Sequence, residues 1–229
     1  MIGDEMTRRK TLVSWSSGKD SAWALHLLRQ QSDVDVVGLF TTMNVEFQRV
    51  AMHAVRRELL QRQAEAVGLP LETLNLPHPC SNERYESVMK EFVAAALERG
   101  VRCMAFGDLF LRDIRTYREE KLQGTGITPL FPLWEIPTGP LARRMVAEGL
   151  RAYVTCVDPK KMPSHFAGRP FDASFLDELP PSVDPCGENG EFHTFAVAGP
   201  MFTKPVEVEV GEIVERDGFL FTDLLPRKA

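Results

Sequence analysis

Two short segments of this chain carry residue types that could do chemistry together. The first, residues 16–21, reads S-S-G-K-D-S and follows a short apolar run, Thr11–Trp15. It precedes Ala22–Arg29, where the apolar residues have helical spacing. A loop between a strand and a helix points backbone N–H groups at its ligand, and the positive end of the helix dipole favours an anion such as phosphate. We therefore expect residues 16–21 to bind phosphate groups.

Each residue type in this loop suits that task. Gly18 allows the backbone to approach a ligand closely, and Lys19 offers a mobile positive charge. Asp20 could cap the helix or help to hold Mg²⁺. Hydroxyl donors come from three serines: Ser16, Ser17 and Ser21. The loop is not a Walker A motif, because Val13 stands where that motif needs a glycine. The alternative interpretation is an N-capped helix after a turn, with a solvated lysine.

The second segment, residues 184–195, reads D-P-C-G-E-N-G-E-F-H-T-F. Its two glycines permit a tight turn that could direct Glu188 and Glu191 into one site. Paired carboxylates can bind a cationic group, hold Mg²⁺ or act as the general base for an amine nucleophile. A surface turn with solvated acids is the alternative, and His193 taken alone is more often a structural histidine.

Alternating strands and helices are expected to position these segments. The predicted strands after the first are Val34–Phe40, Leu71–Leu76, Arg102–Phe106 and Ile127–Leu133, and the intervening helices are Ala22–Arg29, Val50–Val67, Asn82–Arg99 and Leu109–Leu122. Such alternation predicts a parallel sheet covered on both faces, with ligands bound beyond the carboxyl ends of the strands. Gly107 and Asp108 follow the fourth strand, so we expect them to meet residues 16–21 at this edge.

The regular alternation of predicted strands and helices ends near residue 135. A helix over Pro140–Gly149 and a strand over Leu150–Val157 are predicted, and Val206–Leu224 alternates like a small antiparallel meander. We therefore predict an α/β protein with a Rossmann-like parallel-sheet domain over residues 1–134. A smaller α+β lobe over residues 135–229 would carry the second segment.

Composition and charge exclude several classes of protein. The 229 residues are 44% hydrophobic and 26% charged, which is ordinary globular composition. A net charge of −5 gives no general electrostatic attraction to nucleic acid. No apolar run approaches the roughly 20 residues of a membrane span, and no secretory signal is evident. We expect a cytoplasmic protein without nucleic-acid or membrane partners, and the sequence leaves a homodimer open.

Both segments carry a family resemblance. S-S-G-K-D-S resembles the S-G-G-x-D-S loop of the PP-loop ATP pyrophosphatases, with Ser17 where that family usually has glycine. G-E-N-G-E-F-H-T resembles the E-G-G-E-[FY]-H-T signature of the diphthine–ammonia ligase family, which belongs to the same superfamily. The two motifs stand in the family's order, and the resemblance covers most of residues 10–200. It implies an adenine nucleotide alpha hydrolase-like fold of the PP-loop type.

The resemblance also implies an activity and a set of site residues. Relatives adenylate a carboxylate with ATP and Mg²⁺ and then amidate it with ammonia, releasing AMP and pyrophosphate. The implied catalytic residues are Lys19, Glu188, Glu191 and His193. The implied ATP-binding residues are Ser16, Ser17, Gly18, Lys19, Asp20, Ser21, Gly107 and Asp108, with Asp20 also near Mg²⁺. The implied substrate-binding residues are Arg118, Gly190, Glu191, His193 and Thr194.

Several functions remain open at this point. The family's substrate is diphthine, a modified histidine of translation elongation factor 2 that belongs to archaea and eukaryotes. In a bacterium the same chemistry would need a small-molecule carboxylate. A tRNA-modifying thiolase of the superfamily would call for cysteine pairs, whereas the four cysteines here form no C-x-x-C motif. A non-catalytic module that binds adenine nucleotides would not need the acidic cluster of residues 188–194.

Overall fold

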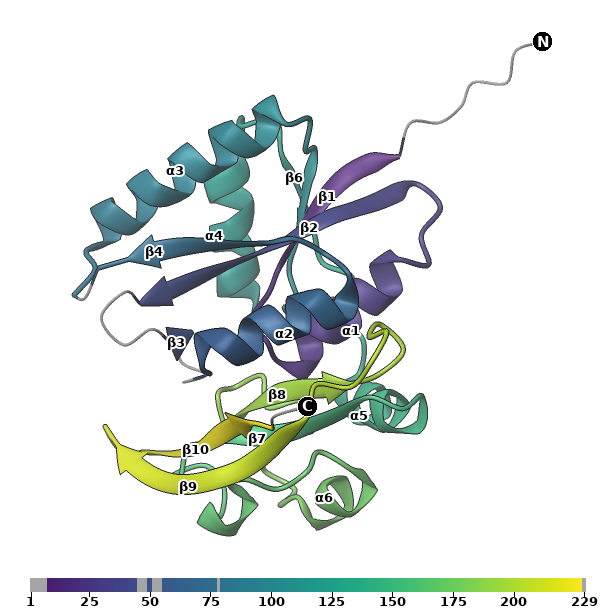
Figure 1. The fold of residues 1–229 in the computed structure, drawn as a ribbon, viewed down its shortest axis with the longest axis vertical. Coiled ribbons are helices and arrows are strands. Elements are labelled where there is room, and N and C mark those ends of the chain that lie inside the picture. The colour runs from purple at the N-terminus through teal and green to yellow at the C-terminus, as the bar shows by residue number, and fades with distance from the viewer. Residues whose placement is uncertain (1–7, 45–48, 51–54, 78, 228–229) are drawn as a thin grey trace.

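The computed structural model describes residues 8–44, 49–50, 55–77 and 79–227. The first half of the chain builds a six-stranded sheet with helices on both faces, and the second half builds a four-stranded antiparallel sheet (Figure 1). In the described part of the chain, no helix has the length and apolar character to cross a membrane.

The larger sheet is parallel apart from one short strand. Its parallel strands are β1 (Arg9–Ser14), β2 (Val34–Asn44), β4 (Leu71–Leu76), β5 (Cys103–Ala105) and β6 (Thr128–Leu130), and β3 (Arg49–Val50) pairs antiparallel with the end of β2. β1 pairs with β2 on one side and with β5 on the other. From β1 the chain first builds outward through β2 and β4, then through β5 and β6. The topological switch between β1 and β5 is where such sheets bind ligands, beyond the carboxyl ends of the strands.

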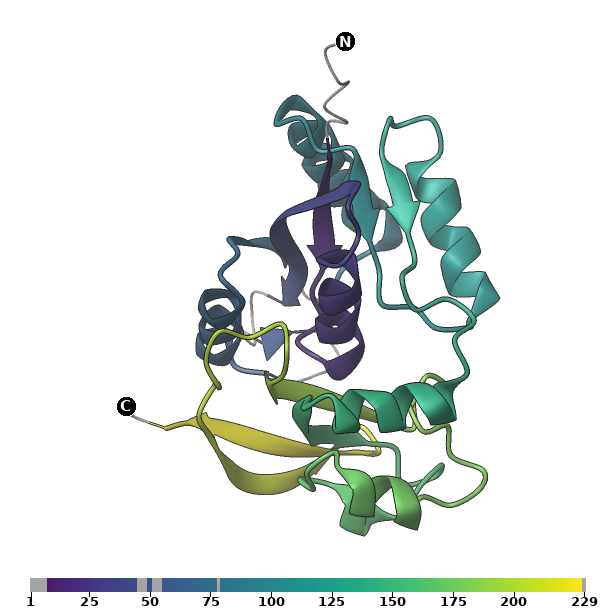
Figure 2. The same ribbon diagram turned by 90° about the vertical axis from the view of Figure 1, so that its right-hand side faces the viewer.

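Helices cover both faces of this sheet (Figure 2). The four helices are α1 (Lys19–Leu28), α2 (Arg57–Val67), α3 (Asn82–Glu98) and α4 (Arg112–Leu122). Because successive residues of a strand face opposite sides, Leu12 packs into the apolar cluster under α3 and α4, while Val13 packs into the cluster with α1 and α2. The predicted parallel sheet with two covered faces is confirmed.

The second sheet has the order β8-β7-β10-β9. Its strands are β7 (Arg151–Val157), β8 (Phe192–Ala198), β9 (Val208–Arg216) and β10 (Phe219–Pro226), with helices α5 (Thr138–Ala147), α6 (Ala173–Glu178) and the 3₁₀ turn η1 (Ser164–Phe166) beside them. Asp217 and Gly218 turn the β9–β10 hairpin with positive φ angles of 53° and 79°, as its tight turn requires. The predicted antiparallel tail is therefore present.

The two sheets share an apolar core. One cluster joins Trp23 of α1 and Leu59 of α2 to Val154 of β7 and Phe195 of β8. β8, an edge strand of the second sheet, is hydrogen-bonded to the loop that opens α1. The division into domains at residue 134 stays a prediction, and this contact places the second half beside residues 16–21.

Some predicted elements differ from the structure. The helix predicted over Val50–Val67 begins only at Arg57, since Val50 belongs to β3 and residues 51–54 lie outside the described part. The helix predicted from Leu109 begins at Arg112. β8 was not predicted, because the polar residues His193 and Thr194 interrupt its apolar pattern.

Candidate active site

A cleft of about 680 Å³ lies at the carboxyl ends of β1, β2 and β5. Its walls come from both halves of the chain. The predicted site residues that line it are Ser16, Gly18, Lys19, Asp20, Ser21, Gly107, Asp108, Arg118, Glu188, Gly190, His193 and Thr194. Ser17 and Glu191 are not among the lining residues. Tertiary structure therefore brings the two motifs together at the switch point of the sheet.

Ser17 holds the loop in place through its backbone. Its φ angle of 71° lies in the left-handed region that favours glycine. Its carbonyl accepts hydrogen bonds from the Ala196 amide of β8 (2.9 Å) and the Gln63 side chain of α2 (3.0 Å). Its hydroxyl is buried, with no hydrogen-bond partner in the described residues. The predicted role of this hydroxyl as a phosphate donor lacks support from its position.

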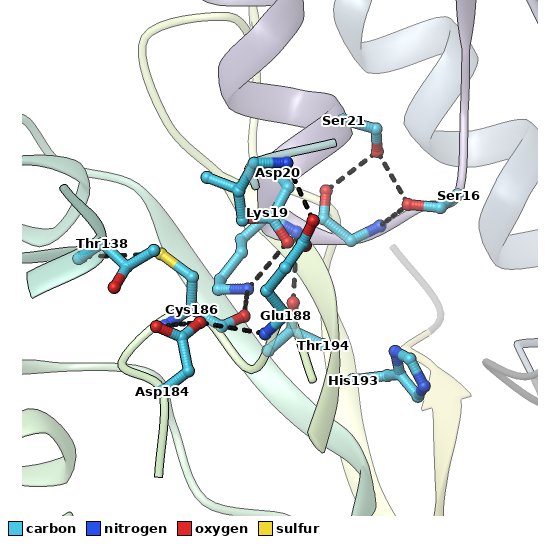
Figure 3. A network of polar contacts seen from close by, with 12 residues as sticks. Ser16, Lys19, Asp20, Ser21, Thr138, Asp184, Cys186, Glu188, His193 and Thr194 are labelled. Atoms are coloured by element: carbon cyan, nitrogen blue, oxygen red, sulfur yellow. Dashed lines mark hydrogen bonds and ion pairs between the residues drawn. The ribbon is translucent and has the colours of Figure 1, made fainter. Parts of the chain in front are cut away.

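Serine hydroxyls brace the first turn of α1 (Figure 3). Ser21 Oγ donates to the Gly18 carbonyl (3.0 Å), and Ser16 Oγ donates to Ser21 Oγ (3.1 Å). Gly18 occupies the N-cap position without a side-chain cap. Backbone N–H groups in the first turn of a helix have no partner within the helix, so they suit an anion in the cleft.

Lys19 is not the mobile charge that the sequence suggested. Its side chain is buried, and its ammonium donates to Asp20 Oδ2 (2.8 Å) and to the Cys186 carbonyl (Figure 3). The rings of Phe171 and Phe192 lie 5.6 Å and 5.3 Å from the ammonium. Burial acts most strongly and lowers the pKa of Lys19, but the Asp20 carboxylate together with Cys186 and Glu188 outweighs it, and the pKa is raised. Lys19 therefore stays charged and joins the loop to the second half of the chain.

Two further contacts fix the start of α1. The backbone N–H of Lys19 donates to Thr194 Oγ1 on β8 (3.1 Å). Gly107, after β5, packs so closely that a Cβ there would lie 3.0 Å from the backbone of Asp20 and of Ser21. Any larger residue would require the backbone of the loop to shift, so backbone packing explains the predicted meeting of Gly107 with the loop.

Glu191 is buried, and its hydrogen bonds hold residues 184–191 in their conformation. Its Oε1 accepts hydrogen bonds from the Asp184 amide (3.0 Å) and the Asn189 side chain (3.1 Å). Asp184 in turn accepts from the backbone N–H groups of Cys186 (3.2 Å) and Glu188 (2.9 Å). These bonds fold residues 184–191 into a compact turn. Asp184 was not predicted as a site residue, and its place at the start of a glycine-containing turn was the available signal.

Glu188 is the carboxylate that this turn presents to the cleft. Its Oε1 accepts from the Leu109 amide (2.8 Å), which ties the turn to the segment after β5. Burial raises the pKa of Glu188 to about 7, and the nearby carboxylates of Asp20 and Asp108 act in the same direction. Such a carboxyl group can exchange a proton near neutral pH, as a general base does.

Two other charged or titratable residues that line the cleft are His193 and Arg118. Burial lowers the pKa of His193 to about 4, so its ring is neutral at pH 7. Arg118 donates to both oxygens of Asp108, at 2.5 Å and 3.1 Å, and its guanidinium lies 4.3 Å from the ring of Phe106. A fixed cation therefore stands at the α4 side of the cleft.

Asp20 is the candidate ligand for a magnesium ion. The described residues contain no group of three or more His, Cys, Asp or Glu side chains placed to hold a metal. Asp20 Oδ1 is nevertheless buried without a hydrogen-bond partner among those residues. Mg²⁺ is commonly held by one or two carboxylates, phosphate oxygens and water, so a single oxygen of this kind fits it.

Gln63 was missed by the sequence analysis. It is fully buried, accepts from the Trp15 indole (2.9 Å) and donates to the carbonyls of Ser17 (3.0 Å) and Ala196 (2.6 Å). The sequence feature that could have identified Gln63 is its position: it is a polar residue one turn after Leu59, on the apolar face of the helix.

Comparisons with known proteins point to one family. The model of the diphthamide synthase N-terminal domain matches residues 9–128, and that of the diphthamide synthase C-terminal domain matches residues 139–222. The diphthine–ammonia ligase of Bos taurus is 26% identical over 191 residues, covering 76% of this chain and 69% of the relative. The Homo sapiens enzyme of that name is 26% identical over 184 residues, covering 73% and 67%.

A solved structure shows a weaker likeness. The U34-tRNA thiolase NcsA from Methanococcus maripaludis, with its 4Fe–4S cluster, aligns with a TM-score of 0.37 and 16% identity. The alignment covers 57% of this chain and 54% of the thiolase. A likeness at this level carries no argument about the function of the chain.

Proposed function

The chain belongs to the diphthamide synthase family, and on that premise we propose that it is an ATP-dependent ligase that adenylates a carboxylate and amidates it with ammonia. AMP and pyrophosphate would be the other products. The observation that carries this proposal is the cleft, where residues of the loop 16–21 other than Ser17 and residues of the segment 186–194 other than Glu191 line one cavity. The loop offers backbone N–H groups to phosphate, and the turn offers a carboxylate to an amine.

The loop side of the cleft suits a nucleotide. The first turn of α1 would hold the phosphates, with Ser16 and Ser21 lining their site, while residues 40–42 of β2 would face the nucleoside. Bound Mg²⁺ beside Asp20 Oδ1 would offset the negative charge between the phosphates and the carboxylate substrate. The hydrogen bond from the Lys19 ammonium to the Cys186 carbonyl would hold the loop and the acidic turn, the two walls of the cleft, at a fixed separation.

The reaction then follows in two displacements. A carboxylate oxygen of the substrate attacks the α-phosphorus, the bond from that phosphorus to the bridging oxygen breaks, and pyrophosphate leaves with the electron pair. Ammonia next attacks the acyl carbon, the bond to the AMP oxygen breaks, and AMP leaves. The surplus proton of the attacking nitrogen passes to Glu188. A pKa of about 7 allows this carboxylate both to attract ammonium and to accept its proton.

The carboxylate substrate has two candidates. Diphthine is the substrate that the names of the mammalian relatives give. A small-molecule carboxylate is the alternative if the source organism is a bacterium. Both use the same cleft and the same chemistry.

The proposal is tested by product analysis. Purified protein is incubated with ATP, Mg²⁺ and ammonium, with either diphthine-bearing elongation factor 2 or a panel of small carboxylic acids. We expect amide, AMP and pyrophosphate in equal amounts, and a loss of about a hundredfold or more in Glu188→Gln. Glu212→Gln on the exposed strand β9 is the matched control. Release of ADP and phosphate in place of AMP, or full activity of Glu188→Gln, would contradict the proposed reaction.

A further inference from the structure

Three residues other than glycine have positive φ angles in the described part of the chain. Ser17 lies in the loop before α1 and Asp217 in the β9–β10 turn, where such an angle has a structural reason. Glu135, with a φ angle of 58°, lies between the regions that the two family models match, residues 9–128 and 139–222. A strained residue persists only where its surroundings hold it, so Glu135 is a candidate for a functional role.

Glu135 belongs to a tight turn between the two halves of the chain. The amide of Ile136 donates to the carbonyl of Leu133 at 3.2 Å, so Glu135 is the third residue of this turn, where a positive φ usually calls for glycine. The amide of Glu135 donates to the carbonyl of Leu109 at 2.8 Å. Its side chain forms an exposed ion pair with Arg112 at 3.3 Å, and such pairs contribute little to stability. The strained backbone therefore supplies one specific hydrogen bond, to Leu109.

Leu109 belongs to a segment, residues 106–111, that is neither helix nor strand. Its side chain is fully buried in the core that the two halves share. Its carbonyl accepts from Glu135, and its amide donates to Glu188 Oε1 at 2.8 Å. In an irregular segment such individual contacts, rather than a ladder of hydrogen bonds, fix the direction of each peptide group. Loss of the bond from Glu135 would therefore let the Leu109 backbone rotate and weaken its bond to Glu188.

The hydrogen bond from Leu109 acts on the carboxylate that the proposed reaction uses. Burial raises the pKa of Glu188 to about 7, and this hydrogen bond is the strongest influence that lowers it. The nearby charged groups that also affect this pKa are Asp20 and Asp108, which raise it, and Lys19, which lowers it. None of them belongs to the turn between the two halves. A change in that turn therefore reaches the carboxylate through Leu109.

We propose that Glu135 is a positioning residue for the proton acceptor of the reaction: its left-handed backbone holds Leu109, and Leu109 holds the carboxylate of Glu188 towards the cleft. This inference rests on the proposed function, which makes Glu188 the proton acceptor. It gives the turn between the two halves a part in the reaction, although Glu135 does not line the cleft.

The first test measures the pKa of Glu188 without using the activity. The side-chain carboxyl carbons of glutamate are labelled with ¹³C, and the signal of Glu188 is assigned from its loss in Glu188→Gln. The pKa is then followed by NMR in the wild type and in Glu135→Val, where a β-branched side chain strongly disfavours the positive φ angle. We expect the pKa to rise by roughly one pH unit, the effect of losing one hydrogen bond to a charged group.

Three control variants isolate the backbone of residue 135. Glu135→Gly keeps the amide and permits the positive φ angle, and Glu135→Gln removes the charge alone. Both should leave the pKa of Glu188 near 7. Asp217→Val is the matched control, because it places the same side chain at a positive φ angle in a residue that does not line the cleft. It should lower stability and leave the pKa of Glu188 unchanged.

A second modification covers the case in which Glu135→Val does not fold. An ester bond in place of the peptide bond between Trp134 and Glu135 removes the N–H group alone. The pKa of Glu188 should again rise, because the Leu109 carbonyl loses its donor. In an assay of amide and AMP formation, the midpoint of kcat/KM against pH should rise with this pKa, while the KM for ATP stays unchanged.

Each outcome decides between specific explanations. An unchanged pKa of Glu188 in folded Glu135→Val or in the ester protein overturns the inference and limits Glu135 to shaping its turn, while amide formation by the wild type leaves the ligase function standing. An equal rise in Asp217→Val also overturns it, because the effect would then be a general loosening of the fold. A rise confined to residue 135, in a protein that forms no amide, supports the positioning of the carboxylate and contradicts the proposed ligase function.

Discussion

Ser17 combines a left-handed backbone with a buried hydroxyl that has no partner among the described residues. A non-glycine residue in this conformation costs about 1–2 kcal/mol, and a buried unpaired hydroxyl costs about 1–3 kcal/mol. Ser17→Gly removes both costs, although the added freedom of the unfolded chain offsets about 0.4–1 kcal/mol. We expect a gain of about 1 kcal/mol or more in the free energy of unfolding, measured by urea denaturation.

Ser17→Ala is the control for this prediction. It removes the hydroxyl and keeps the Cβ, so it should gain less stability than Ser17→Gly. Because Ser17 does not line the cleft, the KM for ATP should be unchanged in both variants. A large rise in that KM would show that the hydroxyl binds phosphate after all.

Glu188 links the activity to pH. Its pKa of about 7 means that the carboxylate forms as the pH rises through neutrality. We expect kcat/KM for amide formation to rise across pH 6–8, with a midpoint near 7. The residual activity of Glu188→Gln should lack this step. A wild-type profile that is flat over the same range would exclude Glu188 as the proton acceptor.

The raised pKa of Glu188 also makes the stability of the protein depend on pH. Stability should fall as the pH rises, whereas activity should increase. Between its ordinary pKa of 4.5 and its folded value of about 7, the folded protein binds a proton that the unfolded chain has released. The contribution of Glu188 to the free energy of unfolding therefore falls as the pH rises through this interval. Glu188→Gln should be more stable than the wild type at pH 8, and the difference should shrink towards pH 5, as followed by thermal denaturation.

At the scale of elements, β8 and α2 meet at the loop of residues 16–21 through Gln63. Gln63→Leu would leave the carbonyls of Ser17 and Ala196 and the indole N–H of Trp15 buried without this partner. Each such loss costs about 1–3 kcal/mol, so we expect a destabilisation of about 3 kcal/mol or more and a higher KM for ATP. Chemical denaturation and steady-state kinetics measure the two effects.

Two further variants separate the role of Gln63 from helix propensity. Gln61→Leu makes the same change on the exposed face of α2 and should be nearly neutral. Gln63→Glu keeps an acceptor for Trp15 but cannot donate to the two carbonyls, so it should raise the KM for ATP. An unchanged KM in a folded Gln63→Glu protein would limit Gln63 to a structural role.

At the scale of the whole molecule, the shared core joins the two halves. Trp23 and Leu59 of the first half pack with Val154 and Phe195 of the second. We therefore expect the intact chain to unfold in one calorimetric transition, and the isolated segment 1–134 to show no cooperative transition, since the outer face of α1 and α2 would be exposed. Two separate transitions, or a stably folded fragment, would show that the halves are independent.

The sequence by itself determined the alternation of strands and helices, the position of residues 16–21 between β1 and α1, and the presence of an acidic turn near residue 188. These features follow from the spacing of apolar residues and from glycine, which act over a few neighbouring positions. The family resemblance rested on the same local strings, and the family models confirm it.

Only the tertiary structure decided which side chains face the cleft. Glu188 points into it while Glu191, three residues later, is buried behind the turn, and Lys19 is held by a carbonyl 167 residues away. Gln63 joins the loop to β8 from a helix that carries no motif. The direction of a side chain in an irregular turn depends on contacts with distant parts of the chain, and no local pattern of residues specifies those contacts.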